Sequence, residues 1–207
     1  MRIVDLSQEL SNKVIFTLNQ LDFHASKGKS RLLATHIEAP SYLVPNGNAL
    51  NQYEPACFFR DAIVLDLTHM KSKQLINDED LEAAEEAAGL AMREGEIAIL
   101  HTGWEKYAET EDYWVKHPAL SENGAQYLEF KRLVGVGVDT PNVDSPGERD
   151  LPVHCILMTG DLFILENLCN LYQIDRSRFR LIALPPRTKT SVSLVRALAI
   201  LDDASVE

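Results

Sequence analysis

The segment Glu96-Ile-Ala-Ile-Leu-His101 is a short apolar run of the length of a buried β-strand. Two further segments have the same character, Ile63-Val-Leu-Asp-Leu67 before it and Arg132-Leu-Val-Gly-Val-Gly-Val-Asp139 after it. Both are rich in β-branched or aliphatic residues. The sequence therefore predicts three buried strands in the middle of the chain.

Helical segments separate these strands. A helix is predicted from about Asp78 to Arg93, where Asn77 can serve as the N-terminal cap and Gly95 can end the helix. A second amphipathic stretch lies at about 125–131. The alternation of strand, helix, strand, helix and strand favours parallel pairing, and thus an α/β fold.

The two ends of the chain have a different pattern. The first sixty residues contain short extended pieces interrupted by Pro40, Pro45, Asn46-Gly47 and Pro55, and further strands are predicted within 184–201. No linker, repeat or low-complexity tract divides the chain. We therefore expect residues 1–207 to form a single domain, in which the N-terminal part contributes a second sheet layered on the α/β core.

Composition and charge exclude several classes of protein. With 207 residues, 45% hydrophobic and 25% charged, the chain is long enough to bury a sizeable core. No apolar run approaches the roughly 18 residues of a membrane span, and Met1-Arg-Ile-Val-Asp5 does not resemble a signal peptide. A net charge of −11 without a Lys/Arg cluster argues against nucleic acid. We expect a cytoplasmic protein with neither membrane nor nucleic acid as partner.

The cysteines do not indicate a disulfide framework or a thiolate metal site. Cys57, Cys155 and Cys169 are odd in number and contain no Cys-x-x-Cys pair. They are expected to be reduced and mostly buried. Cys155 follows His154 and could be considered a nucleophile, but neighbouring residues of a strand point to opposite faces, so a packing role is favoured.

Residues 32–42, Leu-Leu-Ala-Thr-His-Ile-Glu-Ala-Pro-Ser-Tyr, contain half of a predicted metal site. His36 and Glu38 are two residues apart, so an extended backbone directs both side chains to one face. His154 and Glu166 are candidates for the other half. Imidazole and carboxylate ligands suit zinc, manganese or iron better than calcium or magnesium, and zinc or manganese is expected. Such a metal activates water and polarises a carbonyl.

This segment resembles the signature His-x-Gly-Thr-His-x-Asp-x-Pro-x-His of the cyclase family of metal-dependent hydrolases, which includes kynurenine formamidase and isatin hydrolase. The matching positions are Thr35, His36 and Pro40, with Glu38 in place of the aspartate. The positions that differ are Leu32, Ala34 and Tyr42, in place of histidine, glycine and histidine. Two chemically important residues have therefore changed.

The resemblance extends over nearly the whole chain. The similar segments are Ile3–Ser7, Leu100–Trp104, Val134–Asp144, Leu184-Pro-Pro and Val195-Arg-Ala, together with the twelve-residue spacing of His154 and Glu166. The resemblance implies a layered β/β/α, swivelling-domain-like fold with a partly parallel central sheet and a second mixed sheet. It also implies hydrolysis of a C–N bond in a small amide, formamide or lactam, and a homodimer or homotetramer.

In the family, the residue at the Glu38 position is a metal ligand and the histidine at the Leu32 position belongs to the same cluster. Because leucine cannot coordinate, the chain is expected to hold one metal rather than two, bound by His36, Glu38, His154 and Glu166. The family histidine at the Tyr42 position transfers protons, and a phenol with an ordinary pKa of about 10 is a poor base. Tyr42 could instead donate a hydrogen bond to an oxyanion while Glu38 or Glu166 takes the proton, or it could only fill space.

Several other residues have two possible roles. His24 could supply the missing imidazole, and His101 stands at the end of a predicted strand, yet isolated histidines are commonly structural. Asp139 and Asp144 could orient metal ligands or only cap the turn that follows the strand. Trp104 and Phe23 could line an apolar substrate slot or belong to the core.

Two functions remain open. One is a metal-dependent hydrolase acting on a small-molecule amide. The other is a catalytically degenerate relative that binds a metal or a small carboxylate. An enzyme should bring His36, Glu38, His154 and Glu166 within reach of one ion. An apolar plug of Leu32 and Tyr42 over His36, with a pair between Glu166 and an arginine such as Arg187, would argue against catalysis.

Overall fold

The computed structural model describes residues 1–9 and 34–202. Its strands are β1 (Arg2–Asp5), β2 (His36–Glu38), β3 (Phe59–Asp66), β4 (Leu75–Ile76), β5 (Ile97–His101), β6 (Ala119–Leu120), β7 (Gly135–Val138), β8 (Phe163–Glu166), β9 (Arg178–Ile182), β10 (Val192–Leu194) and β11 (Leu198–Leu201). Its α-helices are α2 (Asp78–Ala88), α3 (Glu111–Val115), α4 (Glu122–Phe130) and α5 (Pro152–Thr159). Short 3₁₀ helices are η1 (Pro40–Tyr42), η2 (Leu50–Gln52), η3 (Pro55–Phe58), η4 (Trp104–Tyr107) and η5 (Leu171–Gln173).

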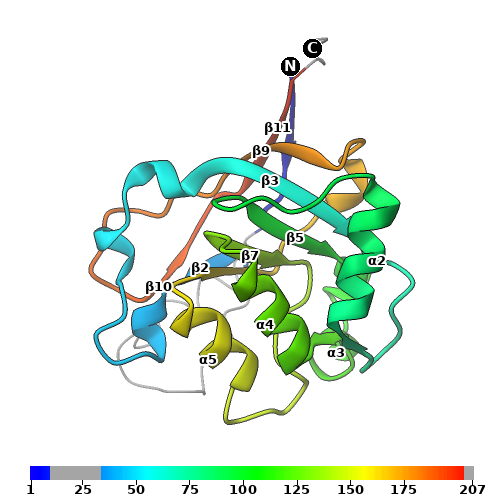
Figure 1. Cartoon of the computed structure of the whole chain (residues 1–207), viewed down its shortest axis with the longest axis horizontal. Coiled ribbons are helices and arrows are strands. Elements are labelled where there is room, and N and C mark those ends of the chain that lie inside the picture. Colours follow the sequence, from blue (N-terminus) through cyan, green and yellow to red (C-terminus); the bar gives the residue numbers. More distant parts are fainter. Residues whose placement is uncertain (10–33, 203–207) are drawn as a thin grey trace.

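Most of the strands belong to one curled, mixed sheet (Figure 1). Among the described residues it has nine strands in the order β1-β11-β9-β3-β5-β7-β8-β2-β10, and a separate sheet pairs β4 with β6 in parallel. The predicted layered α/β fold is confirmed. The expectation that the N-terminal part contributes a second sheet was wrong for the described residues, because β1 and β2 belong to the central sheet. The strands from the two ends of the chain extend that sheet through antiparallel pairing, and β1 and β11 project together from the body.

The three predicted buried strands are β3, β5 and β7, and they pair in parallel as expected. The helix predicted to run from Asp78 to Arg93 is α2, and it ends earlier, at Ala88. The reason is Gly89, which has a φ of 64° and ends the helix in the left-handed conformation that glycine adopts without strain. The second amphipathic stretch is α4, which begins at Glu122 because the Ser121 side chain caps it.

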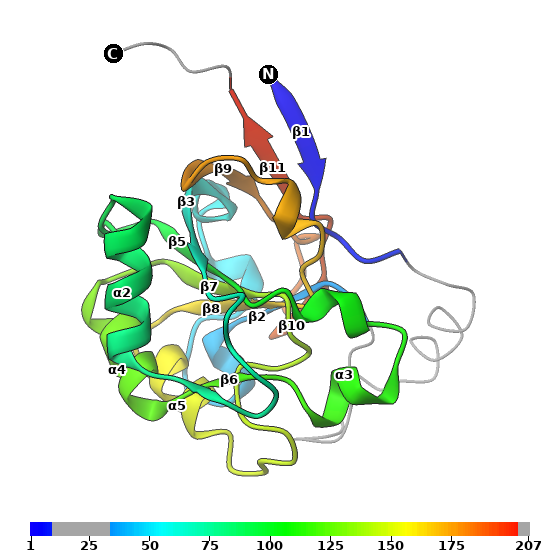
Figure 2. The same ribbon diagram turned by 90° about the vertical axis from the view of Figure 1, so that its right-hand side faces the viewer.

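Both faces of the parallel strands are covered, which explains their continuous apolar sequences. Helices α2, α4 and α5 lie on one face (Figure 2), where Leu81, Leu128 and Leu157 contribute to one buried cluster. The opposite face has a second cluster that includes Ile37, Phe163 and Leu165. Since side chains alternate along a strand, the neighbours of these three residues on β2 and β8 face the helices.

Gly135 on β7 allows close packing against β8. A Cβ atom at this position would lie 2.3 Å from the Phe163 ring. We expect Gly135→Ala to lower the free energy of unfolding by about 1–3 kcal/mol, as overpacking typically does. Chemical denaturation would measure this loss. Adding Phe163→Leu should recover part of it, and strictly additive losses would contradict the steric explanation.

Two expectations about individual segments were wrong. Residues around His154 form the helix α5 and not a strand, and the cysteines are not buried. Cys155 is exposed, and Cys57 and Cys169 are partly exposed. Because it is exposed, Cys155 does not have the expected packing role. As expected, it points away from the buried side on which His154 lies. None of the helices in residues 1–9 and 34–202 is long and apolar enough to span a membrane.

Candidate metal centre

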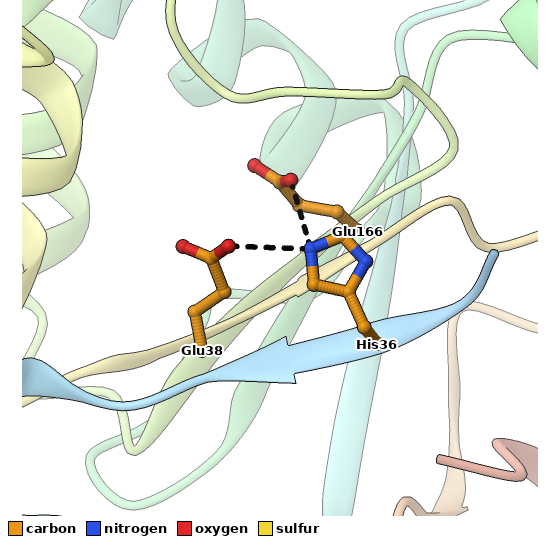
Figure 3. Close-up of side chains that lie close together, drawn as sticks. All are labelled: His36, Glu38 and Glu166. Carbon is orange, nitrogen blue, oxygen red and sulfur yellow. Dashed lines mark ion pairs between the residues drawn. The ribbon is translucent and has the colours of Figure 1, made fainter. Parts of the chain in front are cut away.

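The pairing of β2 with β8 brings three predicted ligands together. His36 lies directly opposite Glu166, and Glu38 lies opposite Ile164, in an antiparallel register. His36 and Glu38 are two residues apart on one strand, so both side chains point to the same face as Glu166. Figure 3 shows one nitrogen of the His36 imidazole facing both carboxylates. The expected convergence of His36, Glu38 and Glu166 is therefore found.

His154 completes the group from the helix that covers this face. It lies in the first turn of α5, and its side chain is buried. Its Nε2 is 3.2 Å from Glu38 Oε2 and 3.5 Å from Glu166 Oε1. Pro152 at the start of α5 is a helix-initiation signal that the sequence interpretation passed over. His154 thus lies beside the other predicted ligands, as expected, although its predicted local structure was wrong.

The four side chains form a compact, buried cluster. His36 Nε2 is 3.3 Å from both Glu38 Oε1 and Glu166 Oε2, and ligand atoms of these three residues lie within 4.8 Å of one another. Each of the four residues is at most 6% exposed. Within the described part of the chain, Glu38 Oε2 accepts no hydrogen bond of good geometry, although it is buried. Burying a carboxylate oxygen without a hydrogen-bond donor is energetically costly, and a bound cation would offset this cost.

The outer nitrogen of each imidazole has an acceptor of its own. His36 Nδ1 is 2.8 Å from the Ala34 carbonyl oxygen, and His154 Nδ1 is 2.5 Å from Asp144 Oδ2. The Asn167 Nδ2 also lies 3.3 Å from His36 Nδ1, but the Ala34 carbonyl oxygen is nearer and can only accept. The Asn167 NH₂ group can donate to that same carbonyl, so we assign a proton to Nδ1 of both imidazoles. In the neutral imidazoles the Nε2 lone pairs then face the carboxylates of Glu38 and Glu166. Four electron-pair donors that face one another require a positive ion among them, either protons or a metal.

Without a metal, protons supply this charge. Burial works against a charged imidazole, but the carboxylates of Glu166 and Glu38 outweigh it and raise the pKa of His36 to about 10. The pKa of His154 is raised well above its ordinary value against the same cost of burial, first by Asp144. Burial also raises the pKa of Glu166, whereas the two histidines overcome burial and lower that of Glu38 to about 2.

The donor set fits a divalent transition metal. Two neutral imidazoles and two carboxylates carry a formal charge of −2, which one divalent cation neutralises. Nitrogen donors mixed with carboxylates suit zinc, manganese or iron. Both histidines also have the outer hydrogen-bond acceptors that metal-ligating histidines usually have. His36, Glu38, His154 and Glu166 are therefore the residues that could hold the metal.

Asp144 orients His154, and Asp139 does not. Besides His154 Nδ1, the Asp144 carboxylate accepts hydrogen bonds from the backbone N–H groups of Val153, at 2.8 Å, and His154, at 3.2 Å. It thus caps α5 and fixes the imidazole at once. The Asp139 carboxylate instead accepts hydrogen bonds from Thr102 and from the Trp104 backbone. Of the two predicted outer acceptors, only Asp144 contacts a predicted ligand.

The remaining candidates have other placements. Tyr42 ends η1, which follows β2 and lies next to α5, and its side chain is partly buried against the helix-side core. Its catalytic role stays a prediction. Trp104 is a core residue whose indole N–H donates to the Tyr113 carbonyl. Phe23, His24 and Leu32 lie outside the described residues.

The pair between Glu166 and an arginine, which would have argued against catalysis, does not occur among the described residues, whereas the plug of Leu32 and Tyr42 involves a residue outside them. Glu166 contacts His36 and His154, and its Oε1 accepts a hydrogen bond of 3.1 Å from the Val143 backbone N–H. Arg187 is exposed and forms no ion pair with Glu166. The second carboxylate is thus available to a cation at the centre of the cluster.

Two buried polar residues near His36 were not predicted from the sequence. Asn167, which follows Glu166, and Tyr113 of α3 are both fully buried and hydrogen-bonded to each other at 2.9 Å. The proximity of Asn167 to a predicted ligand was the only signal in the sequence. Tyr113 gave none, because an isolated tyrosine in a helix is more commonly a core residue.

Comparison with known proteins agrees with this geometry. Residues 4–145 match the model of the Cyclase family. This range includes His36 and Glu38, while His154 and Glu166 lie beyond it. Kynurenine formamidase of Bacillus cereus is 27% identical over 165 residues, which cover 79% of this chain and 73% of that protein. Kynurenine formamidase of Polaromonas naphthalenivorans is 35% identical over 86 residues, covering 41% of this chain and 38% of that protein.

Solved structures share the fold. Isatin hydrolase A from Ralstonia solanacearum superposes with a TM-score of 0.74 at 20% identity, covering 96% of this chain and 91% of that one. Isatin hydrolase A from Labrenzia aggregata bound to benzyl benzoate gives a TM-score of 0.75 at 21% identity, covering 96% and 93%. At these identities the similarity establishes the fold alone.

Proposed function

Because this chain belongs to the Cyclase family, we propose that it is a metal-dependent hydrolase that opens a C–N bond in a small amide, formamide or lactam. The observation that carries this proposal is the convergence of His36, Glu38, His154 and Glu166 on one buried point with no other cation among them in the described chain. The names of the relatives, kynurenine formamidase and isatin hydrolase, support the substrate class.

The proposed chemistry assigns separate tasks to the residues of the cluster. When bound, a divalent cation lowers the pKa of water and polarises a carbonyl. His36 and His154 would hold it as neutral imidazoles, because the Ala34 carbonyl oxygen and the Asp144 carboxylate keep the proton of each ring on Nδ1. Glu38, whose Oε2 lacks a donor, is the proposed proton acceptor. Tyr42 is the proposed hydrogen-bond donor to the developing oxyanion.

We further propose one zinc or manganese per chain and a homodimer or homotetramer as the working assembly. The charge balance supports a single ion, since one divalent cation neutralises the two carboxylates of the cluster. The family resemblance supports the oligomer. Neither the metal nor the assembly determines which amide is cleaved.

The first experiment is metal analysis of protein purified without added metal or chelator. We expect about one equivalent of zinc or manganese per chain in the native protein and almost none after His36→Ala, because the imidazole is a direct ligand. His69→Ala is the matched control, since His69 is exposed and outside the cluster. Elemental analysis of both variants measures the difference.

The metal-loaded protein should then be assayed against aryl formamides and lactams. Hydrolysis that is lost in His36→Ala and retained in His69→Ala would support the enzyme. Metal binding without hydrolysis of any such amide would favour the catalytically degenerate alternative. Native protein that remains metal-free even after reconstitution with zinc or manganese would refute the proposal.

A further inference from the structure

A buried hydrogen-bond chain leads from Tyr113 to the predicted ligand His36. The Tyr113 hydroxyl is 2.9 Å from Asn167 Oδ1, and the Asn167 Nδ2 is 3.3 Å from the Ala34 carbonyl oxygen. That same carbonyl accepts the proton of His36 Nδ1 at 2.8 Å. Tyr113, Asn167, Ala34 and His36 are each at most 2% exposed. Solvent therefore cannot replace any of these partners.

The hydroxyl of Tyr113 determines the orientation of the Asn167 amide. It accepts a hydrogen bond of 3.1 Å from Gln8 Nε2 and keeps its own proton to donate. Asn167 Oδ1, at 2.9 Å, is a nearer acceptor for that proton than the Asp139 carbonyl oxygen, at 3.3 Å. The amide oxygen of Asn167 must then face Tyr113, and its NH₂ group must face the Ala34 carbonyl. If the amide turned over, its oxygen would face the Ala34 carbonyl oxygen, and two buried acceptors would repel each other.

Asn167 also attaches the strand that carries His36 to the segment after Glu166. Its backbone oxygen accepts a hydrogen bond of 2.6 Å from the Thr35 hydroxyl. With a φ of 59°, Asn167 adopts the left-handed conformation that asparagine tolerates better than most residues. The same residue thus contacts both sides of the cluster, close to His36 through its side chain and next to Glu166 along the chain.

We propose that Asn167 and Tyr113 are positioning residues that hold the Ala34 carbonyl in place. In that position the carbonyl keeps the proton of His36 on Nδ1, and the His36 Nε2 is left directed at the metal. This inference rests on the proposed metal centre. Asp144 orients His154 through a direct contact between its carboxylate and Nδ1. His36 is oriented by the Ala34 backbone carbonyl, which is in turn held by a hydrogen bond from Asn167. Three hydrogen bonds, through Asn167 and the Ala34 carbonyl, connect the Tyr113 hydroxyl to the imidazole.

The test is the affinity for Zn²⁺, measured by competition with a chromophoric chelator, and the visible absorption of the Co²⁺-loaded protein, which reports ligand geometry. Tyr113→Phe removes only the hydroxyl. Asn167→Gly removes the amide and keeps the left-handed backbone, which glycine adopts without strain. Both variants should bind Zn²⁺ about 10- to 100-fold more weakly and show an altered Co²⁺ spectrum, as loss of outer partners typically causes.

Tyr127→Phe is the matched control. Its hydroxyl is also hydrogen-bonded within the fold, to Glu85 Oε2 at 2.5 Å, but this bond joins α4 to α2. Tyr127→Phe should lower the melting temperature while leaving the Zn²⁺ affinity within about threefold of the native value, because distant sites act independently. An equal loss of affinity in this variant would indicate general destabilisation and overturn the inference.

The remaining outcomes separate this inference from the function on which it rests. Native protein that binds neither Zn²⁺ nor Co²⁺ would refute the metal centre itself. Native protein that binds both ions, together with unchanged affinity and spectrum in Tyr113→Phe and Asn167→Gly, would refute only the positioning role. Should Tyr113→Phe fail to fold, Asn167→Gly decides the question.

Discussion

Glu38→Gln is expected to abolish metal binding and with it any hydrolysis. Glu38 is the carboxylate that approaches both imidazoles, with Oε1 3.3 Å from His36 Nε2 and Oε2 3.2 Å from His154 Nε2. Glutamine removes one negative charge and places an NH₂ donor where a cation would lie. We expect the Zn²⁺ affinity to fall by more than about 100-fold, the upper end of what loss of an outer partner costs.

Glu96→Gln is the control for this prediction. Glu96, which precedes β5, is also a buried carboxylate, but its Oε1 pairs at 2.7 Å with Arg178, the first residue of β9. Its loss should lower stability, because breaking a buried ion pair leaves the arginine uncompensated. Zn²⁺ titration of both variants should separate the two effects. Native-like Zn²⁺ affinity in Glu38→Gln would show that Glu38 is not a ligand.

Asp144→Asn is expected to weaken metal binding by changing the tautomer of His154. In the native protein, the Asp144 carboxylate accepts a hydrogen bond from His154 Nδ1, so the Nε2 lone pair is directed at Glu38 and Glu166. An asparagine whose NH₂ group faces Nδ1 would move the proton to Nε2, where it competes with a metal. We expect a loss of about 10- to 100-fold in Zn²⁺ affinity, typical for an outer partner of a ligating histidine.

The same substitution removes a helix cap, so stability must be measured in parallel. Asp144 accepts two backbone N–H groups at the start of α5, and a lost cap costs about 1 kcal/mol. Asp139→Asn is the matched control, because Asp139 is equally buried and also accepts backbone N–H groups. Both variants should lower the melting temperature, but only Asp144→Asn should weaken Zn²⁺ binding. Equal affinities would contradict the tautomer argument.

The candidate site was predictable where its geometry is local. His36 and Glu38 share a face because successive side chains of a strand alternate, and this holds whatever the strand pairs with. His154 was identified through the family resemblance, while its local structure was predicted wrongly. The apolar residues after Pro152 fit a strand as well as a short buried helix, and only packing against the sheet decides between them.

The residues that orient the ligands were harder to find, because their roles depend on contacts between distant segments. Asp144 was predicted equally well as an outer acceptor or as a turn cap, and it proves to contact His154 and to cap α5. Tyr113 reaches Asn167 across 54 positions of the sequence. No local pattern distinguishes such a hydroxyl from that of any other buried tyrosine.

The sequence by itself determined the parallel core, because β3, β5 and β7 are apolar runs separated by helical segments and need both faces buried. It also determined the kinds of ligand that the chain can offer. Only the tertiary structure decided that His36 pairs in register with Glu166, that α5 brings His154 over the same face, and which nitrogen of each imidazole is left for a metal. The first two features depend on strand register and helix packing, which form only when segments more than a hundred residues apart come together. The third depends on the acceptors Ala34 and Asp144, which are near their imidazoles in the sequence but reach them only in the folded backbone.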